Sequence, residues 1–255
     1  MYQQAITRGV SAKLNDCYLE YKQPELIDIG AARHQHDAYV ATLQDLGLKV
    51  TVLPEDDDLP DCCFVEDSAV VTESFALITN MGTSERNGER EVVAEFLTRD
   101  LKGIRMQPPA QLEGGDVLRI GRTLYVGLSS RTNREGINFL RHISSDHGYT
   151  VVETPVVGAL HLKTAVTYAG KGVVVCSAAM RPIMENLLEG MDIFVPPLTE
   201  EGGANVLNVN DTTVIPAGYP HVAEALMVRG LTLRELDISE FEKAEAGLTC
   251  MSILF

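Results

Sequence analysis

A short pattern recurs five times along the chain and constrains the fold more than any other feature. Each copy has a glycine, a strand-like run in which apolar and polar residues alternate, and a proline or acidic residue at the end. Helical periodicity precedes each copy, and the glycines lie 40 to 56 residues apart. This spacing predicts one supersecondary unit used five times. The copies span residues 47–54, 103–109, 148–155, 190–197 and 230–237.

The segments between these copies predict a strand-strand-helix-strand order in each unit. We expect hairpins that turn at Gly121, at Gly170–Gly172 and at Asn210. The segment FVEDSAVVT (64–72) reads as a strand, and a helix is expected over 35–46. A further helix is expected to follow Ser129 or Ser130 as its N-cap.

No linker or low-complexity tract separates the units, and a single unit cannot bury its apolar face alone. The sequence therefore predicts an α/β fold with one domain over residues 1–255 and the units arranged in a ring. A ring sends the corresponding loop of every unit to the same end of its axis. Those loops carry the residues that we single out as candidates: Asp61, Glu66, Asp67, Glu113, His161, Glu201 and Cys250.

The charge balance limits the classes of partner. The chain has 21 Lys and Arg against 36 Asp and Glu, a formal net charge of −15. This excess of acids argues against binding to nucleic acid or to an anionic membrane, and it is compatible with a small cationic substrate. The oligomeric state is left open, and a homodimer is one of the options.

The expected location is the cytoplasm. The first thirty residues lack a basic start followed by an apolar run, and no apolar stretch approaches the roughly 20 residues that span a bilayer. The five cysteines are odd in number and scattered, so we expect reduced thiols rather than a disulfide framework.

Cys250 and His161 each have a structural and a functional interpretation. A free cysteine is usually a small buried hydrophobe, which suits Cys176 in an apolar strand. Cys250 instead ends the last polar loop, where a nucleophile is an equally good interpretation. His161 alone among six histidines is expected to start a strand at the loop position shared by the repeats, whereas His34 and His36 read as solvated surface.

The acids and arginines are individually weaker signals. Glu113 precedes two glycines, which indicate either a simple turn or a close approach of the backbone to a ligand or a neighbouring strand. Acids before an apolar strand, as in 61–67, are unfavourable unless they are paired or bind a ligand. Arg86 and Arg131 lie in polar turns and are in isolation most simply surface charges. The chain has no CxxC, HExxH or EF-hand pattern, so no metal is expected.

Several motifs together resemble those of the dimethylarginine dimethylaminohydrolases, which are guanidine-modifying enzymes related to arginine deiminases. The motifs are LPDCCFVED, LEGGDV, GLSSRTN, ALHLK and LTCMSIL, and they run almost end to end in the same order. The resemblance implies a five-bladed α/β propeller of ββαβ units with pseudo-fivefold symmetry. It implies cleavage of Nω-methylated arginine to citrulline and an alkylamine, without a cofactor.

The resemblance also implies roles for individual residues. It makes Cys250 the nucleophile, His161 the general acid and base, and Glu113 the carboxylate that orients the histidine. The expected substrate contacts are Glu66 and Asp67 at the guanidinium, Asp61 near the amino-acid head, Arg86 and Arg131 at the carboxylate, and the main chain of Leu19 and Ala244. Ala244, Glu245 and the glycines of 202–203 depart from the family pattern, which affects the fit around the alkylated nitrogen.

Three other functions stay open at this point. An arginine deiminase would use similar machinery and release ammonia. A different amidinohydrolase or amidinotransferase of the same fold would act on another guanidine. An inactive guanidine-binding module would keep the binding residues without turnover.

Overall fold

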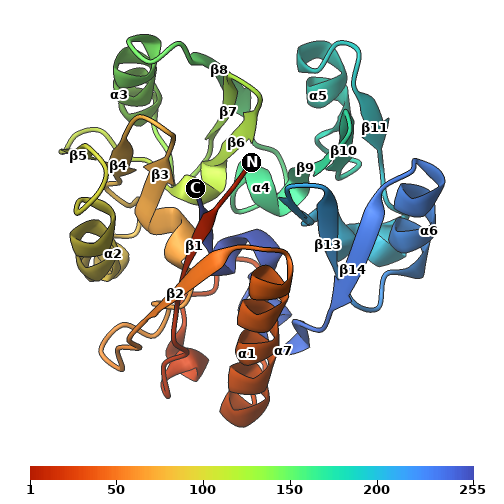
Figure 1. Cartoon of the computed structure of the whole chain (residues 1–255), viewed down its shortest axis with the longest axis horizontal. Coiled ribbons are helices and arrows are strands. Elements are labelled where there is room, and N and C mark those ends of the chain that lie inside the picture. The colour runs from red at the N-terminus through yellow and green to blue at the C-terminus, as the bar shows by residue number, and fades with distance from the viewer.

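The computed structural model describes residues 1–255 and arranges them as five small three-stranded sheets around a common centre (Figure 1). In four sheets the first two strands are antiparallel neighbours along the chain, and a helix leads to a third, parallel strand. These units are β3(Ala69–Val71) β4(Ala76–Ile78) α2(Arg90–Leu97) β5(Gly103–Arg105); β6(Val117–Ile120) β7(Thr123–Leu128) α3(Arg134–Ser145) β8(Thr150–Pro155); β9(Val166–Gly170) β10(Val173–Cys176) α5(Arg181–Leu187) β11(Asp192–Phe194); and β12(Leu207–Val209) β13(Thr212–Pro216) α6(Pro220–Val228) β14(Thr232–Leu236).

The remaining sheet is assembled from both ends of the chain. Strand β1(Gln4–Arg8) pairs in parallel with β2(Lys49–Leu53) and antiparallel with β15(Ile253–Leu254), and α1(Ile29–Asp45) connects β1 to β2. The N- and C-terminal ends therefore lie side by side near the centre of the molecule (Figure 1). This sheet has the strand directions of the other four, which confirms the predicted five-fold repetition of a ββαβ unit.

The hydrophobic core explains why the sheets form a ring. It divides into five clusters, each of which joins a helix to its own sheet and to the sheet before it. Helix α3, for example, contributes Ile137 and Leu140 to a cluster with Leu124 of its own sheet and Leu77 of the preceding one. The cluster that contains α1 includes Val214 of the last sheet, so the series closes on itself. The structure is propeller-like, as expected.

Four of the five glycines of the repeat have a common conformational role. Gly47, Gly148, Gly190 and Gly230 follow helices with φ between 74° and 88°. Such left-handed backbone after a helix favours glycine because it has no Cβ. Gly103 differs: it lies in β5, where a Cβ would come 2.3 Å from Cγ2 of Thr98. All five positions hold glycine, but four need it for the backbone conformation and Gly103 needs it for lack of space.

Some local predictions were wrong. Residues Val65–Ser68 form a 3-10 turn and only Ala69–Val71 form a strand, so the FVED acids lie before the strand. The N-cap of α3 is Asn133, whose side chain accepts from the amide of Gly136, rather than Ser129 or Ser130. His161 precedes the short helix α4(Leu162–Ala165) instead of starting a strand. The three predicted hairpins are confirmed.

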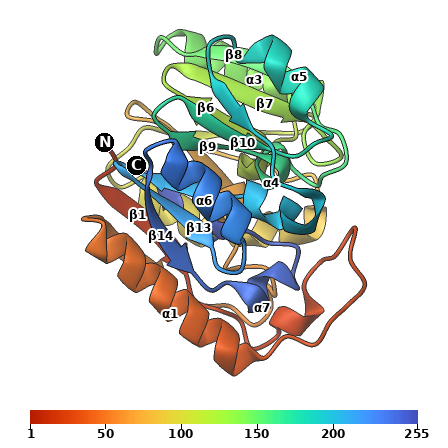
Figure 2. The same cartoon turned by 90° about the vertical axis from the view of Figure 1, so that its right-hand side faces the viewer.

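Two further elements flank the candidate site. Helix α7(Ser239–Glu242) packs beside α1, and the N-terminal loop, which we define as residues 17–28, runs next to α7 (Figure 2). His36 in α1 is buried, contrary to the expectation of a solvated surface, because it shares a helix face with Ala32, Tyr39 and Leu43 of the core. None of the helices has the length and apolar character that crossing a membrane requires.

Candidate active site

A small cavity brings together residues from the beginning, middle and end of the chain. It has a volume of about 30 Å³ and contains Asp67, His161 and Cys250 in its lining. These residues and Asp61 come from three segments of the chain, at positions 61–67, 161 and 250. Consecutive segments are more than 80 positions apart, so only the ring brings them to one place. The other lining residues are Tyr18, Asp61, Phe64, Arg86, Arg131, Leu160, Thr164, Ala244, Glu245 and Ala246.

Cys250 lies in the 3-10 turn Leu248–Met251, directly before β15. Its sulfur accepts a weak hydrogen bond from the amide of Gly247 at 3.4 Å. Burial raises the pKa of the thiol to about 12, and the nearby charges of Glu66 and Asp67 act in the same direction. The thiol is therefore protonated at neutral pH in the absence of a ligand. A cationic ligand beside it would favour the thiolate.

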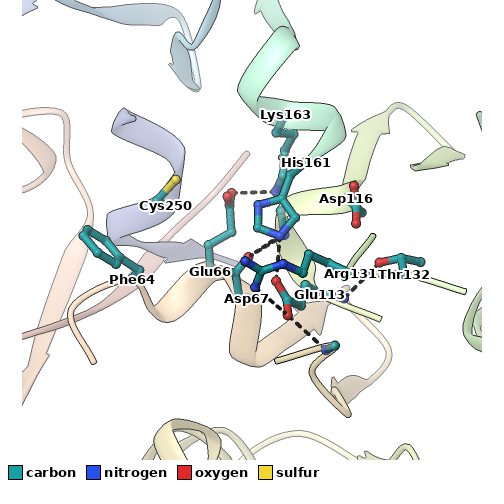
Figure 3. A network of polar contacts seen from close by, with 12 residues as sticks. Phe64, Glu66, Asp67, Glu113, Asp116, Arg131, Thr132, His161, Lys163 and Cys250 are labelled. Carbon is teal, nitrogen blue, oxygen red and sulfur yellow. Dashed lines mark hydrogen bonds and ion pairs between the residues drawn. The ribbon is translucent and has the colours of Figure 1, made fainter. Parts of the chain in front are cut away.

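His161 is held among carboxylates. Its Nε2 lies 2.6 Å from Oε2 of Glu113 and 3.8 Å from Oδ1 of Asp67 (Figure 3). Burial by itself lowers the pKa of the imidazole, but the charge of Asp67 and the hydrogen bond with Glu113 outweigh it and raise the pKa to about 9. The imidazole is consequently protonated at neutral pH and can act as a general acid.

Glu113 is fully buried and its carboxylate is fixed from several sides. Oε1 accepts from the amide of Gly82 at 3.0 Å and from the amide of Thr83 at 3.3 Å, and Nη1 of Arg131 lies 3.6 Å away. The second glycine after it has a steric function: a Cβ at Gly115 would lie 2.8 Å from the ring of His161. The structure shows both a 3-10 turn over Gly114–Asp116 and a close approach of the backbone, and the groups approached belong to the protein itself.

Asp116 supports the histidine from the other side of the same turn. Its Oδ1 accepts from the amide of Leu162 at 2.9 Å, and its Oδ2 accepts from the hydroxyl of Ser129 at 2.6 Å. Because Leu162 follows His161 directly, these bonds fix the backbone that carries the imidazole. Sequence reasoning assigned no role at the site to this aspartate.

Asp67 and Arg86 form a buried ion pair on the cavity wall. Nη1 of Arg86 lies 2.9 Å from Oδ2 of Asp67, and the other face of the guanidinium binds Glu89 at 2.8 Å. Burial raises the pKa of Asp67, but the charges of His161 and Arg86 more than offset it and lower the pKa to about 2. Asp67 is an anion over the whole working pH range. Arg86 is thus a buried partner of acids rather than the surface charge that its polar turn indicated.

Glu66 faces a different way from Asp67. Its Oε1 accepts from Nζ of Lys163 at 2.5 Å and its Oε2 accepts from the hydroxyl of Thr249 at 3.0 Å (Figure 3). It lines a second cavity of about 160 Å³, which also contains Arg119 and Tyr168, and it is absent from the lining of the first. Glu66 and Lys163 therefore line the second cavity and not the first. The carboxylate of Glu66 is nevertheless close enough to Cys250 to raise the pKa of the thiol.

The N-terminal loop forms part of the cavity wall. The amide of Tyr18 donates to Oδ2 of Asp61 at 3.2 Å, and the ring of Tyr18 lies 4.8 Å from the guanidinium carbon of Arg131. Tyr18 lines the cavity, whereas its neighbour Leu19, which we expected there, does not. On the opposite side Ala244 lines the cavity as expected. Burial raises the pKa of Asp61, against the effect of Arg86.

Glu245 ties this loop to the body of the protein. Its carboxylate accepts from the amides of Glu20 at 3.0 Å, Tyr21 at 2.6 Å and Lys22. Glu245 itself has φ of 58°, in the left-handed region that residues with a Cβ rarely adopt. A departure from the family pattern thus coincides with the attachment point of the loop.

Most of the predicted residues gather at the cavity, but Leu19 and Glu66 are absent from its lining and Glu201 lies elsewhere. Glu201 is exposed on a 3-10 turn away from the cavity, while its neighbour Glu200 accepts from the amides at the start of α6. Sequence reasoning missed Tyr18 and Lys163. Lys163 was within the quoted ALHLK motif, two residues after His161, but Tyr18 belongs to no motif.

The carboxylates of Asp67 and Glu113 and the imidazole of His161 have ligand atoms within 4.8 Å of one another. Such a set can in principle hold a cation. Here each atom has an internal partner, because Glu113 binds Nε2 of His161 and Asp67 binds Arg86. The arrangement is that of a carboxylate-bound histidine.

Comparison with known proteins decides the family. Residues 6–190 match the family model described as eukaryotic N,N dimethylarginine dimethylhydrolase. The chain belongs to the dimethylarginine dimethylaminohydrolase family. The family enzyme of Pseudomonas aeruginosa is 34% identical over 89% of this chain and 90% of its own length. That of Streptomyces coelicolor is 36% identical over 98% of this chain and 96% of its own length.

Solved structures agree with this assignment. A mutant of the Pseudomonas aeruginosa enzyme in complex with citrulline has a TM-score of 0.95 and 32% identity over the full length of both chains. A second dimethylarginine dimethylaminohydrolase structure, an adduct with S-methyl-L-thiocitrulline, gives the same values. The N-terminal domain of a cyanobacterial arginine dihydrolase has a TM-score of 0.89 at 17% identity, which shows a shared fold. The fold and family predicted from sequence motifs are confirmed.

Proposed function

We propose that this chain hydrolyses Nω-methylated arginine to citrulline and an alkylamine through a covalent intermediate on Cys250. The observation that carries the proposal is one cavity lined by a thiol, a carboxylate-bound imidazole and the anion Asp67, in a chain of this family. A resonance-stabilised guanidinium is a poor electrophile for water, and a thiolate attacks it more readily.

In the first half-reaction Asp67 holds the guanidinium and places its carbon beside the sulfur. The positive charge lowers the pKa of the thiol, which releases its proton to solvent, and the resulting thiolate attacks the carbon. The bond from that carbon to the alkylated nitrogen breaks as this nitrogen takes a proton from His161, and the alkylamine leaves. The product is an S-alkylthiouronium on Cys250, and Glu113 keeps the imidazole in position throughout.

In the second half-reaction His161, now neutral, takes a proton from water, and the water oxygen adds to the same carbon. The bond from carbon to sulfur breaks, which releases citrulline and restores the thiol. The proton given to the alkylamine and the first proton taken from water both pass through one imidazole, and the second proton of that water restores the thiol. The hydrogen bond of the imidazole with Glu113 and its contact with Asp67 support that double use, because they stabilise its protonated form.

The substrate contacts are part of the proposal. Arg131 and Asp61 line the cavity together with Asp67, Tyr18 and Ala244. We assign the α-carboxylate of the substrate to Arg131 and its α-ammonium group to Asp61. Arg86 holds Asp67 through their ion pair, and Glu66 lies close to the sulfur of Cys250 without lining this cavity. We also propose that residues 1–255 form one domain, supported by the five shared clusters, and that five free cysteines reflect a reducing cytoplasmic compartment.

The test is product analysis with matched cysteine variants. We expect the purified chain to form citrulline and an equal amount of methylamine or dimethylamine from the methylated arginines. Cys250→Ala should abolish turnover, whereas Cys176→Ala, in β10 and outside the cavity, should keep it. A strong preference for arginine with release of ammonia would replace the proposal with a deiminase. Tight binding of methylated arginine without turnover would indicate a binding module.

A further inference from the structure

The cavity at Cys250 is small in the ligand-free protein, with a volume of about 30 Å³, and it adjoins a larger cavity of about 290 Å³ that shares Leu160, Thr164, Glu245 and Ala246 with it. The N-terminal loop contributes Tyr18 to the wall and covers Arg131. A ligand that binds Arg131 must therefore displace the loop groups that contact it.

The carboxylate of Glu20, in the N-terminal loop, binds the guanidinium of Arg131, which lines the cavity. Oε2 of Glu20 accepts from Nη2 of Arg131 at 3.1 Å and from Nε at 3.3 Å. Oε1 accepts from the hydroxyl of Ser130 at 3.3 Å. The Arg131 side chain is only 5% exposed, and its Nη1 is bound to Thr83 and lies 3.6 Å from Oε1 of Glu113. Glu20 thus occupies the edge formed by Nε and Nη2, which is the edge that could bind a ligand carboxylate through two hydrogen bonds.

We propose that Glu20 is an internal competitor for the substrate carboxylate and thereby sets the affinity of this site for guanidino amino acids. The inference rests on the proposed function, because it takes Arg131 as the carboxylate contact. Two carboxylates cannot share the same pair of N–H groups, since both their charges and their acceptor atoms would coincide. An amino-acid ligand therefore exchanges its own carboxylate for that of Glu20.

The exchange predicts a selective effect of Glu20. When an amino acid is bound, Glu20 has lost Arg131, so removing the Glu20 charge beforehand favours binding. When a guanidine without a carboxylate is bound, Glu20 keeps Arg131, and the same removal has no effect on the equilibrium. Glu20 therefore reduces the preference for ligands that carry a carboxylate. Glu25 supplies a matched control, because it is an exposed acid of the same loop and makes no hydrogen bond or ion pair.

The experiment measures binding without turnover. Calorimetry in the Cys250→Ser background compares monomethylarginine with its decarboxylated analogue. We expect Glu20→Gln to tighten binding of monomethylarginine about three- to tenfold, as for removal of a partly buried ion pair, and to change the analogue less than twofold. Glu25→Gln should leave both unchanged, and Glu20→Asp should fall between the parent and Glu20→Gln. With Cys250 present, KM should fall in Glu20→Gln while kcat changes less than twofold.

Other outcomes would overturn the inference. Unchanged or weaker binding of monomethylarginine in Glu20→Gln would show that Glu20 does not compete and instead supports the closed loop or contacts the ligand. Equal tightening of both ligands would indicate a general effect on loop opening. Failure of the proposed function is recognised separately, as binding in the parent chain without release of citrulline and alkylamine.

Discussion

At the scale of single residues, the site places titratable groups so that each shifts the pKa of the next. The carboxylates keep His161 protonated, and the imidazolium with Arg86 keeps Asp67 ionised. Burial, together with the charges of Glu66 and Asp67, keeps the Cys250 thiol protonated. A guanidinium ligand therefore enters a site with a ready proton donor and a nucleophile that its own charge activates.

The first prediction concerns stability and pH. The pKa of His161 is raised from 6.5 to about 9 in the folded protein, so the folded state binds its proton more tightly than the unfolded state. The resulting stabilisation is complete below pH 6.5 and is lost as pH rises through 9, by up to about 3 kcal/mol. Urea unfolding of the parent between pH 6 and 9.5 should show this decline.

His161→Asn is the control for that decline, since it removes the titrating group and retains a polar side chain. The variant should have a flatter stability profile over the same pH range, whatever its absolute stability. Parallel profiles for the two proteins would show that other groups cause the change.

The second prediction concerns the thiol. Without a ligand, the reaction of Cys250 with iodoacetamide should stay slow up to about pH 9, because its pKa is near 12. A saturating guanidino amino acid that is not turned over should lower the pKa of the thiol by at least one unit. Absorbance of the thiolate at increasing pH, with Cys250→Ser subtracted to remove the other four cysteines, provides the measurement. Identical curves with and without ligand would contradict activation by the ligand.

At the scale of elements, short turns position the site more than long helices do. Cys250, Glu66 and Asp67 lie in 3-10 turns, and Glu113 and His161 are the residues directly before a 3-10 turn and a short helix. These turns are fixed by side chain to backbone hydrogen bonds, such as Asp116 to Leu162 and Asp67 to Gly115. Hydrophobic periodicity carries no information about them, which is why the sequence assigned strands to two of these segments.

The third prediction tests the N-cap of α3. Asn133 accepts from the amide of Gly136 at 2.8 Å and from the amide of Gln111 at 3.0 Å, so Asn133→Ala should lower the free energy of unfolding by about 1–2 kcal/mol. Asn133→Asp keeps the acceptor and should recover most of that loss. Ser130→Ala, at a position that the sequence predicted as the cap, should change stability by less than about 0.5 kcal/mol. Denaturant unfolding of the three variants checks the order, and a larger loss in Ser130→Ala would refute it.

At the scale of the whole molecule, the two ends of the chain complete the ring and carry the nucleophile. β15 pairs with β1 through Ala5 and Ile6, and Ile253 is buried against the first and second sheets. Cys250 precedes β15 by two residues, so closure of the ring also sets the position of the sulfur. Stability and activity should therefore depend on the same strand.

The fourth prediction follows from this dependence. Ile253→Ala removes a side chain that is 6% exposed and should lower the free energy of unfolding by about 2–4 kcal/mol. Activity per folded molecule should fall as well, because the turn that holds Cys250 loses its anchor. Val228→Ala, at a side chain 81% exposed on α6, should leave both unchanged. Chemical unfolding and initial rates on the same samples check this, and full activity in folded Ile253→Ala would separate closure from catalysis.

The sequence by itself determined the repeat, the class of chemistry and most of the candidate residues. Glycines after helices, alternating strands and short motifs are local signals, because backbone conformation and burial of one face act over a few residues. The ring order followed from the repeat, and LTC with ALHLK and LEGGDV pointed to a thiol, an imidazole and a carboxylate. The prediction for Glu201 was wrong because its loop resembles the others in sequence, whereas in the structure the side chain is exposed and does not line the cavity.

Only the tertiary structure decided how these groups act on one another. It separated Asp67, which faces the thiol cavity, from Glu66, which binds Lys163, although the two are adjacent in sequence. It placed Tyr18 and Glu20 over Arg131, more than a hundred residues away. Contacts of this kind depend on how whole sheets close around an axis, and electrostatic shifts depend on distances of a few ångströms within a buried site. Neither quantity is encoded in the pattern of neighbouring residues.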